Sequence, residues 1–170
     1  VIVIGGGMTA IDIAVQSKKL GASEVTIAYR RDQNHMKASE HEQQYAQIND
    51  VKLSFCYNPI KILSENGQLT GVEFEITKLD EDGKIFNTGK TIQLEADVLF
   101  KAIGQTLLTE QLGDLNESLK LENGKLAVSK DKKTTLDKVW AGGDCISDGE
   151  DLTVSAVQDG KLAAESINKH

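Results

Sequence analysis

The first ten residues, VIVIGGGMTA (residues 1–10), join an apolar run to a glycine-rich turn. Four consecutive apolar residues are typical of a strand that is buried on both faces of a parallel sheet. Apolar residues then recur at helical spacing from Thr9 to Leu20, and Gly21 ends that pattern. A strand, a glycine-rich turn and a helix in this order predict the start of a nucleotide-binding unit.

The alternation of strand and helix continues beyond this first helix. Val25–Tyr29 predicts a second strand, and Val51–Phe55 predicts a third. Between them, Ser39 and Glu42 have the spacing of a capping box, which predicts a helix that runs to about Ile48. We therefore expect an α/β fold with a Rossmann-like doubly wound parallel sheet.

The pattern changes after the third strand. Two apolar runs, Ile60–Leu63 and Leu69–Ile76, flank Asn66-Gly67, which is a strong signal for a hairpin turn. Together with Thr91–Leu94 they predict an antiparallel β-meander. Val98–Ile103 then predicts a return to the parallel sheet.

We place a boundary near Gly104, between a first part (residues 1–104) and a second part (residues 105–170). In the second part, Asn123-Gly124 lies between two short apolar runs and predicts another hairpin. Lys138–Ala141 predicts a strand, and a helix is expected from about Thr153 to Asn168.

The glycine-rich turn has the residues that a dinucleotide site requires. Gly5 permits a tight turn, Gly7 lets the backbone approach a pyrophosphate, and Ala10 lets the helix pack close to the strand. The amino end of the helix then offers free N–H groups and a positive dipole end to the phosphates. The predicted binding residues are Gly5, Gly6, Gly7, Met8, Thr9 and Ala10. A purely structural glycine turn is the alternative.

The residues that follow the second strand distinguish the two nicotinamide cofactors. An Asp or Glu at this place binds the ribose 2′-hydroxyl of NAD, whereas guanidinium groups suit the 2′-phosphate of NADP. This chain has Arg30 and Arg31 there. We therefore expect NADPH, with NADH still possible; two solvated surface arginines are the alternative.

A second sequence pattern lies near the carboxyl end. Val139–Asp144 and the helix after it resemble the closing segment of the flavin site in flavoproteins with two dinucleotide domains. The resemblance implies that Asp144 binds the ribityl chain of FAD, and that the helix amino end points at the flavin ring and stabilises negative charge there. The implied contacts are Gly143, Asp144, Thr153 and Val154. An ordinary turn followed by a helix is the alternative.

Within these flavoproteins the chain resembles one branch, the small (β) subunit of glutamate synthase and the flavin-containing part of dihydropyrimidine dehydrogenase. The residues that carry this resemblance are Gly5–Asp12, Tyr29–Asp32 with Met36, Asp97–Gln105, and Ala141–Asp144 with Thr153–Val157. The resemblance implies that Gly104 is a further cofactor contact. Residues 1–104 then form an NAD(P)-binding Rossmann-like domain, and residues 105–170 form the C-terminal segment of an FAD-binding domain.

The resemblance implies that NADPH gives a hydride to FAD and that electrons then pass singly to iron–sulfur clusters. Those clusters are expected elsewhere in the parent protein or on a partner subunit, because Cys56 and Cys145 are far apart in this chain. Hydride transfer needs stacked rings rather than an acid or base, so no catalytic side chain is named.

Composition narrows the class of protein. Of the 170 residues, 19 are Lys or Arg and 26 are Asp or Glu, and the net charge of -7 disfavours nucleic acid as a partner. The sequence has no apolar run long enough to span a membrane. Two unpaired cysteines suggest a reducing, cytoplasmic setting.

Val1 opens directly on a buried-strand pattern without an initiator Met. We therefore expect a fragment. Because the second pattern also lacks its usual partner, a glycine-rich turn nearer the N-terminus, the fragment should lack the N-terminal FAD half and be inactive alone.

Two other functions fit the same residues. One is a thioredoxin-reductase-like disulfide reductase, which would carry a Cys-x-x-Cys upstream of the glycine-rich turn. The other is a non-catalytic module that senses nucleotides.

Overall fold

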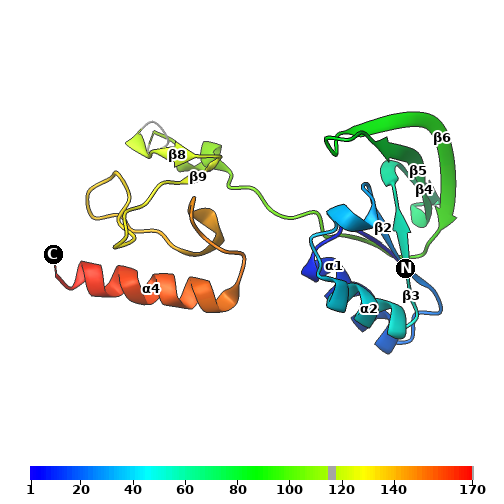
Figure 1. Cartoon of the computed structure of the whole chain (residues 1–170), viewed down its shortest axis with the longest axis horizontal. Helices are drawn as coiled ribbons and strands as arrows, with labels where there is room; N and C mark the ends of the chain where they lie inside the picture. Colours follow the sequence, from blue (N-terminus) through cyan, green and yellow to red (C-terminus); the bar gives the residue numbers. More distant parts are fainter. Residues whose placement is uncertain (115–117, 170) are drawn as a thin grey trace. The chain divides into compact units, whose positions relative to one another are not determined.

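A computed structural model describes residues 1–114 and 118–169 (Figure 1). The chain divides into two compact units, Val1–Gly104 and Gln105–His170. Each unit has its own packing and is described by itself.

Unit 1 is built on a four-stranded parallel sheet with the order β3-β2-β1-β7. The strands are β1 (Ile2–Ile4), β2 (Val25–Tyr29), β3 (Val51–Phe55) and β7 (Leu99–Lys101). All neighbouring pairs are parallel, and Ile4 lies opposite both Ala28 of β2 and Lys101 of β7. The carboxyl ends of β1, β2 and β7 therefore meet at one edge of the sheet.

Two helices, α1 (Met8–Lys19) and α2 (Glu40–Ile48), cover one face of this sheet (Figure 1). Side chains alternate between the two faces along a strand, so Val3 and Ile27 pack with the helices, whereas Ile2 and Ala28 face the other way. The helix-side core is formed by buried residues of β1, β2, β3, α1 and α2, including Ala10, Ile11, Ala14, Val15 and Ala46.

The other face of the sheet is covered by three antiparallel strands in the order β4-β5-β6. These are β4 (Tyr57–Glu65), β5 (Gln68–Leu79) and β6 (Ile85–Glu95), all longer than the apolar runs that predict them. Phe74 and Val72 of β5 pack on Ile2 and Ala28 in a second core. The mixed α/β class, with a parallel sheet and an antiparallel meander, is therefore confirmed.

The β4–β5 turn follows the sequence signal closely. Asn66 has a φ of 51° and Gly67 a φ of 78°, so both adopt the left-handed conformation that a two-residue hairpin loop requires. A short 3₁₀ helix, η1 (Gln33–His35), follows β2.

Unit 2 contains less regular structure. Its elements are η2 (Thr109–Leu112), the β8 (Leu121–Glu122) and β9 (Lys125–Leu126) hairpin, η3 (Gly143–Cys145) and α4 (Thr153–Ile167). The prediction of a strand at Lys138–Ala141 is wrong, because this segment makes only an isolated bridge between Trp140 and Lys133. Lys138 has a φ of 58°, which interrupts an extended conformation.

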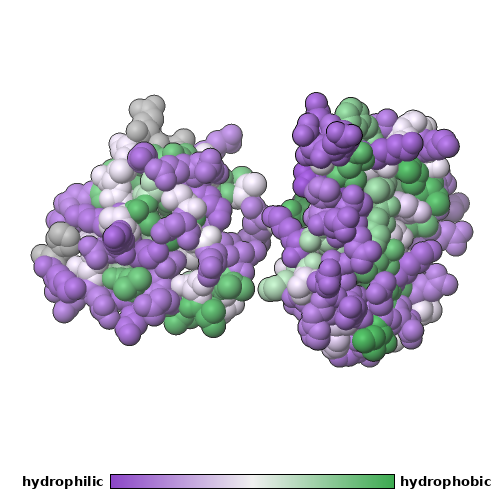
Figure 2. Space-filling view, viewed as in Figure 1, coloured by the Kyte–Doolittle hydropathy of each residue, from purple (hydrophilic) through white to green (hydrophobic). Residues whose placement is uncertain are grey.

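Hydrophilic residues cover much of the visible face of both units, with hydrophobic side chains in patches between them (Figure 2). In the part of the chain that the structure describes, none of the helices has the length and apolar character needed to cross a membrane.

Candidate functional site

The glycine-rich turn between β1 and α1 has no room for side chains at its first two positions. Gly5 has a φ of 148°, and a methyl group there would collide with the carbonyl oxygen of Ala102. At Gly6 a methyl carbon would lie 2.6 Å from the ring of Tyr29. Hydrogen bonds from the Gly5 amide to the Ala28 carbonyl (3.1 Å) and from the Ala102 amide to the Ile4 carbonyl (2.7 Å) fix the turn between β2 and β7.

Gly7 lies in different surroundings. A methyl group added there would meet no atom within 4 Å, so the backbone faces open space. Gly7 is also the N-cap of α1, with no side-chain cap and no acidic residue in the first turn. The amino end of α1, with Met8 and Thr9 exposed and Ala10 buried beneath them, is therefore free to receive an anion.

The structure places Arg30 and Arg31 directly after β2, at the same edge of the sheet as the glycine-rich turn. Two hydrogen bonds hold their backbone: the Thr77 hydroxyl of β5 donates to the Arg30 carbonyl (2.8 Å), and the amide of Cys56, between β3 and β4, donates to the Arg31 carbonyl (2.9 Å). The side chain of Arg30 is exposed.

Arg31 is half-buried, and its Nε is a buried donor without a hydrogen-bond partner among the described residues. Buried donors in native proteins are normally satisfied. An anionic acceptor at this place, such as a nucleotide phosphate, would satisfy it.

Gly104 ends unit 1, three residues beyond β7, and has a φ of 87°. Because β7 pairs in parallel with β1, its carboxyl end points to the same edge as the glycine-rich turn. The structure therefore brings the predicted contacts of unit 1 to one edge, where open α/β sheets bind their ligands.

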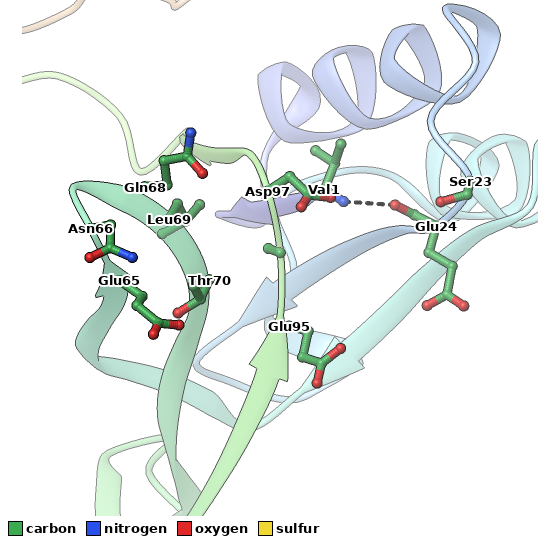
Figure 3. A pocket seen from close by; sticks show the side chains of 11 residues that line it. Val1, Ser23, Glu24, Glu65, Asn66, Gln68, Leu69, Thr70, Glu95 and Asp97 are labelled. Carbon is green, nitrogen blue, oxygen red and sulfur yellow. Dashed lines mark hydrogen bonds between the residues drawn. The ribbon is translucent and has the colours of Figure 1, made fainter.

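A cavity of about 640 Å³ lies elsewhere on this unit, around the residues that precede the strands (Figure 3). Val1 lines it, and its amino group donates to the Glu24 carbonyl at 2.8 Å. The carboxylates of Glu24, Glu65, Glu95 and Asp97 also lie around it. Four acidic side chains repel phosphates, so this cavity is unsuited to a nucleotide.

In unit 2 the second glycine turn forms η3. Gly143 is buried, has a φ of 79° and donates its amide to the Asp159 carboxylate at 2.9 Å. A methyl group at Gly142 would lie 2.6 Å from the Cβ of Asp159. The turn thus packs directly on α4 and leaves the side chain of Asp144 exposed.

The amino end of α4 resembles that of α1. Its N-cap residue, Leu152, gives no side-chain cap, and the first turn has no acidic residue. Thr153 and Val154 are both exposed, Val154 by 75%. The structure therefore brings Gly143, Asp144 and the first turn of α4 together within unit 2.

Helix α2 provides a contrast within the same chain. The Ser39 side chain accepts from the Glu42 amide (3.3 Å), and the Glu42 carboxylate accepts from the Ser39 amide (2.6 Å). This is the capping box that the sequence predicts. The chain thus caps α2 with its own side chains, whereas the N-cap residues of α1 and α4 give no side-chain cap; at the first turn of α4, the Ser155 hydroxyl donates to the Glu150 carboxylate (2.6 Å).

Sequence reasoning missed the polar residues that hold these turns, above all Lys132 and Asp159. Both are buried, and the Lys132 Nζ lies 2.8 Å from the Asp159 Oδ1. The hydrogen bond from Lys132 lowers the pKa of the Asp159 carboxyl, and the same contact raises the pKa of the Lys132 ammonium. One available signal was the presence of an acidic residue, Asp159, within the predicted last helix.

No group of three or more His, Cys, Asp or Glu side chains that could hold a metal ion occurs among the residues the structure describes. Cys56 lies in unit 1 and Cys145 in unit 2, both as free thiols. Next to the arginines, a hydrogen bond from His35 lowers the pKa of the exposed Asp32 carboxyl.

Known proteins similar to this chain are oxidoreductases. The glutamate synthase (NADPH) small chain of Escherichia coli (strain K12) is 32% identical over 180 residues, which cover 98% of this chain and 38% of the relative. The corresponding small chain of Halomonas elongata is 33% identical and is covered to 37%. The chain thus spans under two fifths of the length of these relatives.

Among solved structures, Lactococcus lactis thioredoxin reductase matches with a TM-score of 0.82 and 25% identity, over 99% of this chain and 51% of the reductase chain. The sequence pattern of the family described as "Pyridine nucleotide-disulphide oxidoreductase" matches residues 1–160. The chain therefore belongs to the pyridine nucleotide-disulphide oxidoreductase family.

Proposed function

We propose that unit 1 binds NADPH and that unit 2 is the closing part of an FAD site, within a longer flavoprotein that passes a hydride from NADPH to FAD. The observation that carries this proposal is the uncapped amino end of α1, which opens beside two arginines at the carboxyl edge of the parallel sheet. The family supports a pyridine nucleotide and a flavin as the cofactors.

The residues of unit 1 would bind and orient the nucleotide. The amides at the start of α1 would hold the pyrophosphate, because a helix amino end has free N–H donors and a partial positive charge. Arg30 and the unpartnered Nε of Arg31 would bind the 2′-phosphate, which favours NADPH over NADH.

The residues of unit 2 would hold the flavin. Asp144 would accept hydrogen bonds from the ribityl chain, and the open amino end of α4, at Thr153 and Val154, would stabilise negative charge on the ring system. Bound FAD supplies the hydride chemistry itself. No described side chain needs to act as an acid or base.

Two further parts of the proposal concern the rest of the protein. The upstream FAD half would come from a segment outside this chain, since the relatives are much longer. Electrons would leave FAD through iron–sulfur clusters on other segments or a partner subunit, as in glutamate synthase or dihydropyrimidine dehydrogenase. The similarity to two glutamate synthase small chains, at 32% and 33% identity, supports a role of the glutamate synthase kind.

Titration of NADPH and NADH against wild type and Arg30→Ala tests the nucleotide site. Since a hydrogen bond to a charged group contributes about 1.5–3 kcal/mol, Arg30→Ala should weaken NADPH binding by about 10- to 100-fold. NADH, which lacks the 2′-phosphate, should lose about twofold at most. Lys90→Ala removes one exposed positive charge from β6 and is the control. Equal losses for the two nucleotides would remove Arg30 from the site.

A disulfide reductase of the thioredoxin reductase type is a second candidate, favoured by the TM-score of 0.82 to the Lactococcus lactis enzyme. Cys56 and Cys145 belong to different units, so a redox pair close in sequence would have to come from outside this chain. A Cys-x-x-Cys upstream of Val1 in the parent gene, with NADPH oxidation that depends on a disulfide substrate as the electron acceptor, would favour this candidate.

A further inference from the structure

The strongest polar network outside the proposed contacts lies beneath the η3 turn of unit 2. Lys132 and Asp159 are each only 8% exposed, and their charged groups lie 2.8 Å apart. Asp148, an exposed residue, is more distant, at 3.7 Å from the Lys132 Nζ. A buried ion pair this close needs further hydrogen bonds to offset its desolvation.

Those further hydrogen bonds go to the glycine turn. The second oxygen of Asp159 accepts the Gly143 amide at 2.9 Å, and the Cβ of Asp159 fills the space beside Gly142. Asp159 lies on α4, so one side chain joins the turn that presents Asp144 to the helix that begins at Thr153.

Lys132 reaches the same turn by a second route. Its carbonyl accepts the Ala141 amide at 3.0 Å, directly before Gly142. Its own backbone has a φ of 63°, a left-handed conformation that a lysine seldom adopts, held by a hydrogen bond from its amide to the Ser129 carbonyl (2.9 Å). Lys132 is thus attached to both ends of the Ala141–Gly143 segment, once by backbone and once through Asp159.

We propose that Lys132 and Asp159 are positioning residues, which set the orientation of the η3 turn and of the amino end of α4 toward the flavin. This inference rests on the proposed function of unit 2. Lys132 also neutralises the buried carboxylate, which would otherwise place an uncompensated negative charge beside the turn that is to hold an anionic cofactor.

The test uses the full-length natural protein that carries these residues, with FAD as the probe. Its readouts are the FAD dissociation constant, the midpoint potential of bound FAD, and hydrogen exchange at residues 143–145 without FAD. Asp159→Ala should weaken FAD binding and speed exchange by about 10-fold or more, because it removes a charge-assisted hydrogen bond. Lys132→Met should weaken FAD binding to a similar extent and shift the potential negatively, because it leaves the carboxylate unpaired.

The double variant Lys132→Met with Asp159→Asn should recover most of the loss. The Asn oxygen still accepts from the Gly143 amide, and no buried charge remains. Glu122→Ala is the control for loss of a charge: it breaks an ion pair of equal length, 2.8 Å, between exposed side chains, and Glu122 interacts with Ser147 rather than with a residue of η3 itself. We expect this control to change FAD binding by less than about twofold.

The outcomes separate the two proposals. Wild-type protein that binds no FAD overturns the proposed function and this inference with it. If wild type and Asp159→Ala bind FAD with the same affinity, this inference alone is overturned. The same holds if Asp159→Ala lowers the melting temperature but leaves the FAD affinity and the potential unchanged. If Asp159→Ala does not fold, Asp159→Asn takes its place: one acceptor must then serve two donors, and a loss of about threefold or more is expected.

Discussion

Gly6 and Gly7 are neighbours in the sequence, but a methyl group at each would have different consequences. At Gly6 it would lie 2.6 Å from the Tyr29 ring, whereas at Gly7 it would enter open space. Gly6→Ala should therefore lower the free energy of unfolding by about 1–3 kcal/mol, the usual effect of overpacking. Gly7→Ala should lower it by less than about 1 kcal/mol.

Substitution of Gly7 should weaken NADPH binding, although it has little effect on the free energy of unfolding. If a pyrophosphate approaches the backbone there, Gly7→Ala weakens NADPH binding by about tenfold, or about 1.4 kcal/mol. Urea denaturation and calorimetric titration on both variants give the two quantities. A Gly7→Ala protein with wild-type NADPH affinity would show that the phosphates do not contact this turn.

The Lys132–Asp159 pair makes the stability of unit 2 depend on pH at both extremes. The pKa of Asp159 is lower in the folded protein, so its contribution is present above about pH 4 and is lost as the pH falls through the folded value. The pKa of Lys132 is raised, so its contribution is complete below about pH 10 and is lost as the pH rises through the folded value.

The variant with Lys132→Met and Asp159→Asn should therefore have a flatter pH profile than wild type. Urea denaturation between pH 3 and pH 9 measures the acid limb, where the wild type should lose its advantage over the variant as the pH drops below about 4. Glu122→Gln, in the exposed pair with Lys120, should leave that limb nearly unchanged. If the free energy of unfolding changes with pH in parallel for wild type and the double variant, the lowered pKa of Asp159 is contradicted.

At the scale of elements, the meander does more than cover the sheet, because it holds the backbone that carries the arginines. Thr77 of β5 is 2% exposed and donates to the Arg30 carbonyl at 2.8 Å. Thr77→Val keeps the shape but leaves that carbonyl without its partner. The free energy of unfolding should fall by about 1–3 kcal/mol, and the preference for NADPH over NADH should shrink.

Thr88→Val is the control for this variant. The Thr88 hydroxyl donates to the Ile76 carbonyl at 2.6 Å, entirely within the meander. A similar loss of stability is expected, with an unchanged ratio of the two dissociation constants. If both variants alter that ratio equally, the meander does not act through Arg30.

The amino ends of α1 and α2 should differ in their effect on NADPH binding. Ser39→Ala removes the cap of α2 and should lower the free energy of unfolding by about 1 kcal/mol. NADPH affinity should not change, because α2 has no predicted contact with the nucleotide. Weaker NADPH binding in this variant, measured at a temperature where the protein is fully folded, would place α2 in the site.

The elements that the sequence predicts well are those whose signal is local. The capping box at Ser39 and the turn at Asn66-Gly67 depend on a few adjacent residues, and both are present as expected. The prediction of a strand at Lys138–Ala141 was wrong because a strand needs a neighbouring strand to pair with, and in this segment Trp140 makes only an isolated bridge. The pairing of Lys132 with Asp159 could not be predicted from the sequence, because the two residues are 27 positions apart and no local pattern links them.

At the scale of the whole molecule, the chain holds two compact units whose predicted contacts serve different cofactors. Residues 1–104 contain the glycine-rich turn, the arginines and Gly104, and the second unit contains η3 and α4. An uncapped helix amino end occurs in each unit. We therefore expect a unit to bind its cofactor tightly only if its own residues form the whole binding site.

The 170-residue chain alone should bind the two cofactors to different extents. NADPH contacts are proposed entirely within unit 1, so calorimetry should detect NADPH binding. FAD contacts in unit 2 are limited to the η3 turn and the start of α4, so FAD should bind weakly or not at all, and the chain should not oxidise NADPH. A longer natural chain that includes the upstream segment should bind both cofactors and become yellow. Tight FAD binding by residues 1–170 alone would contradict the proposal that the site needs a second half, because two exposed helix and turn ends offer few of the buried contacts on which cofactor affinity depends.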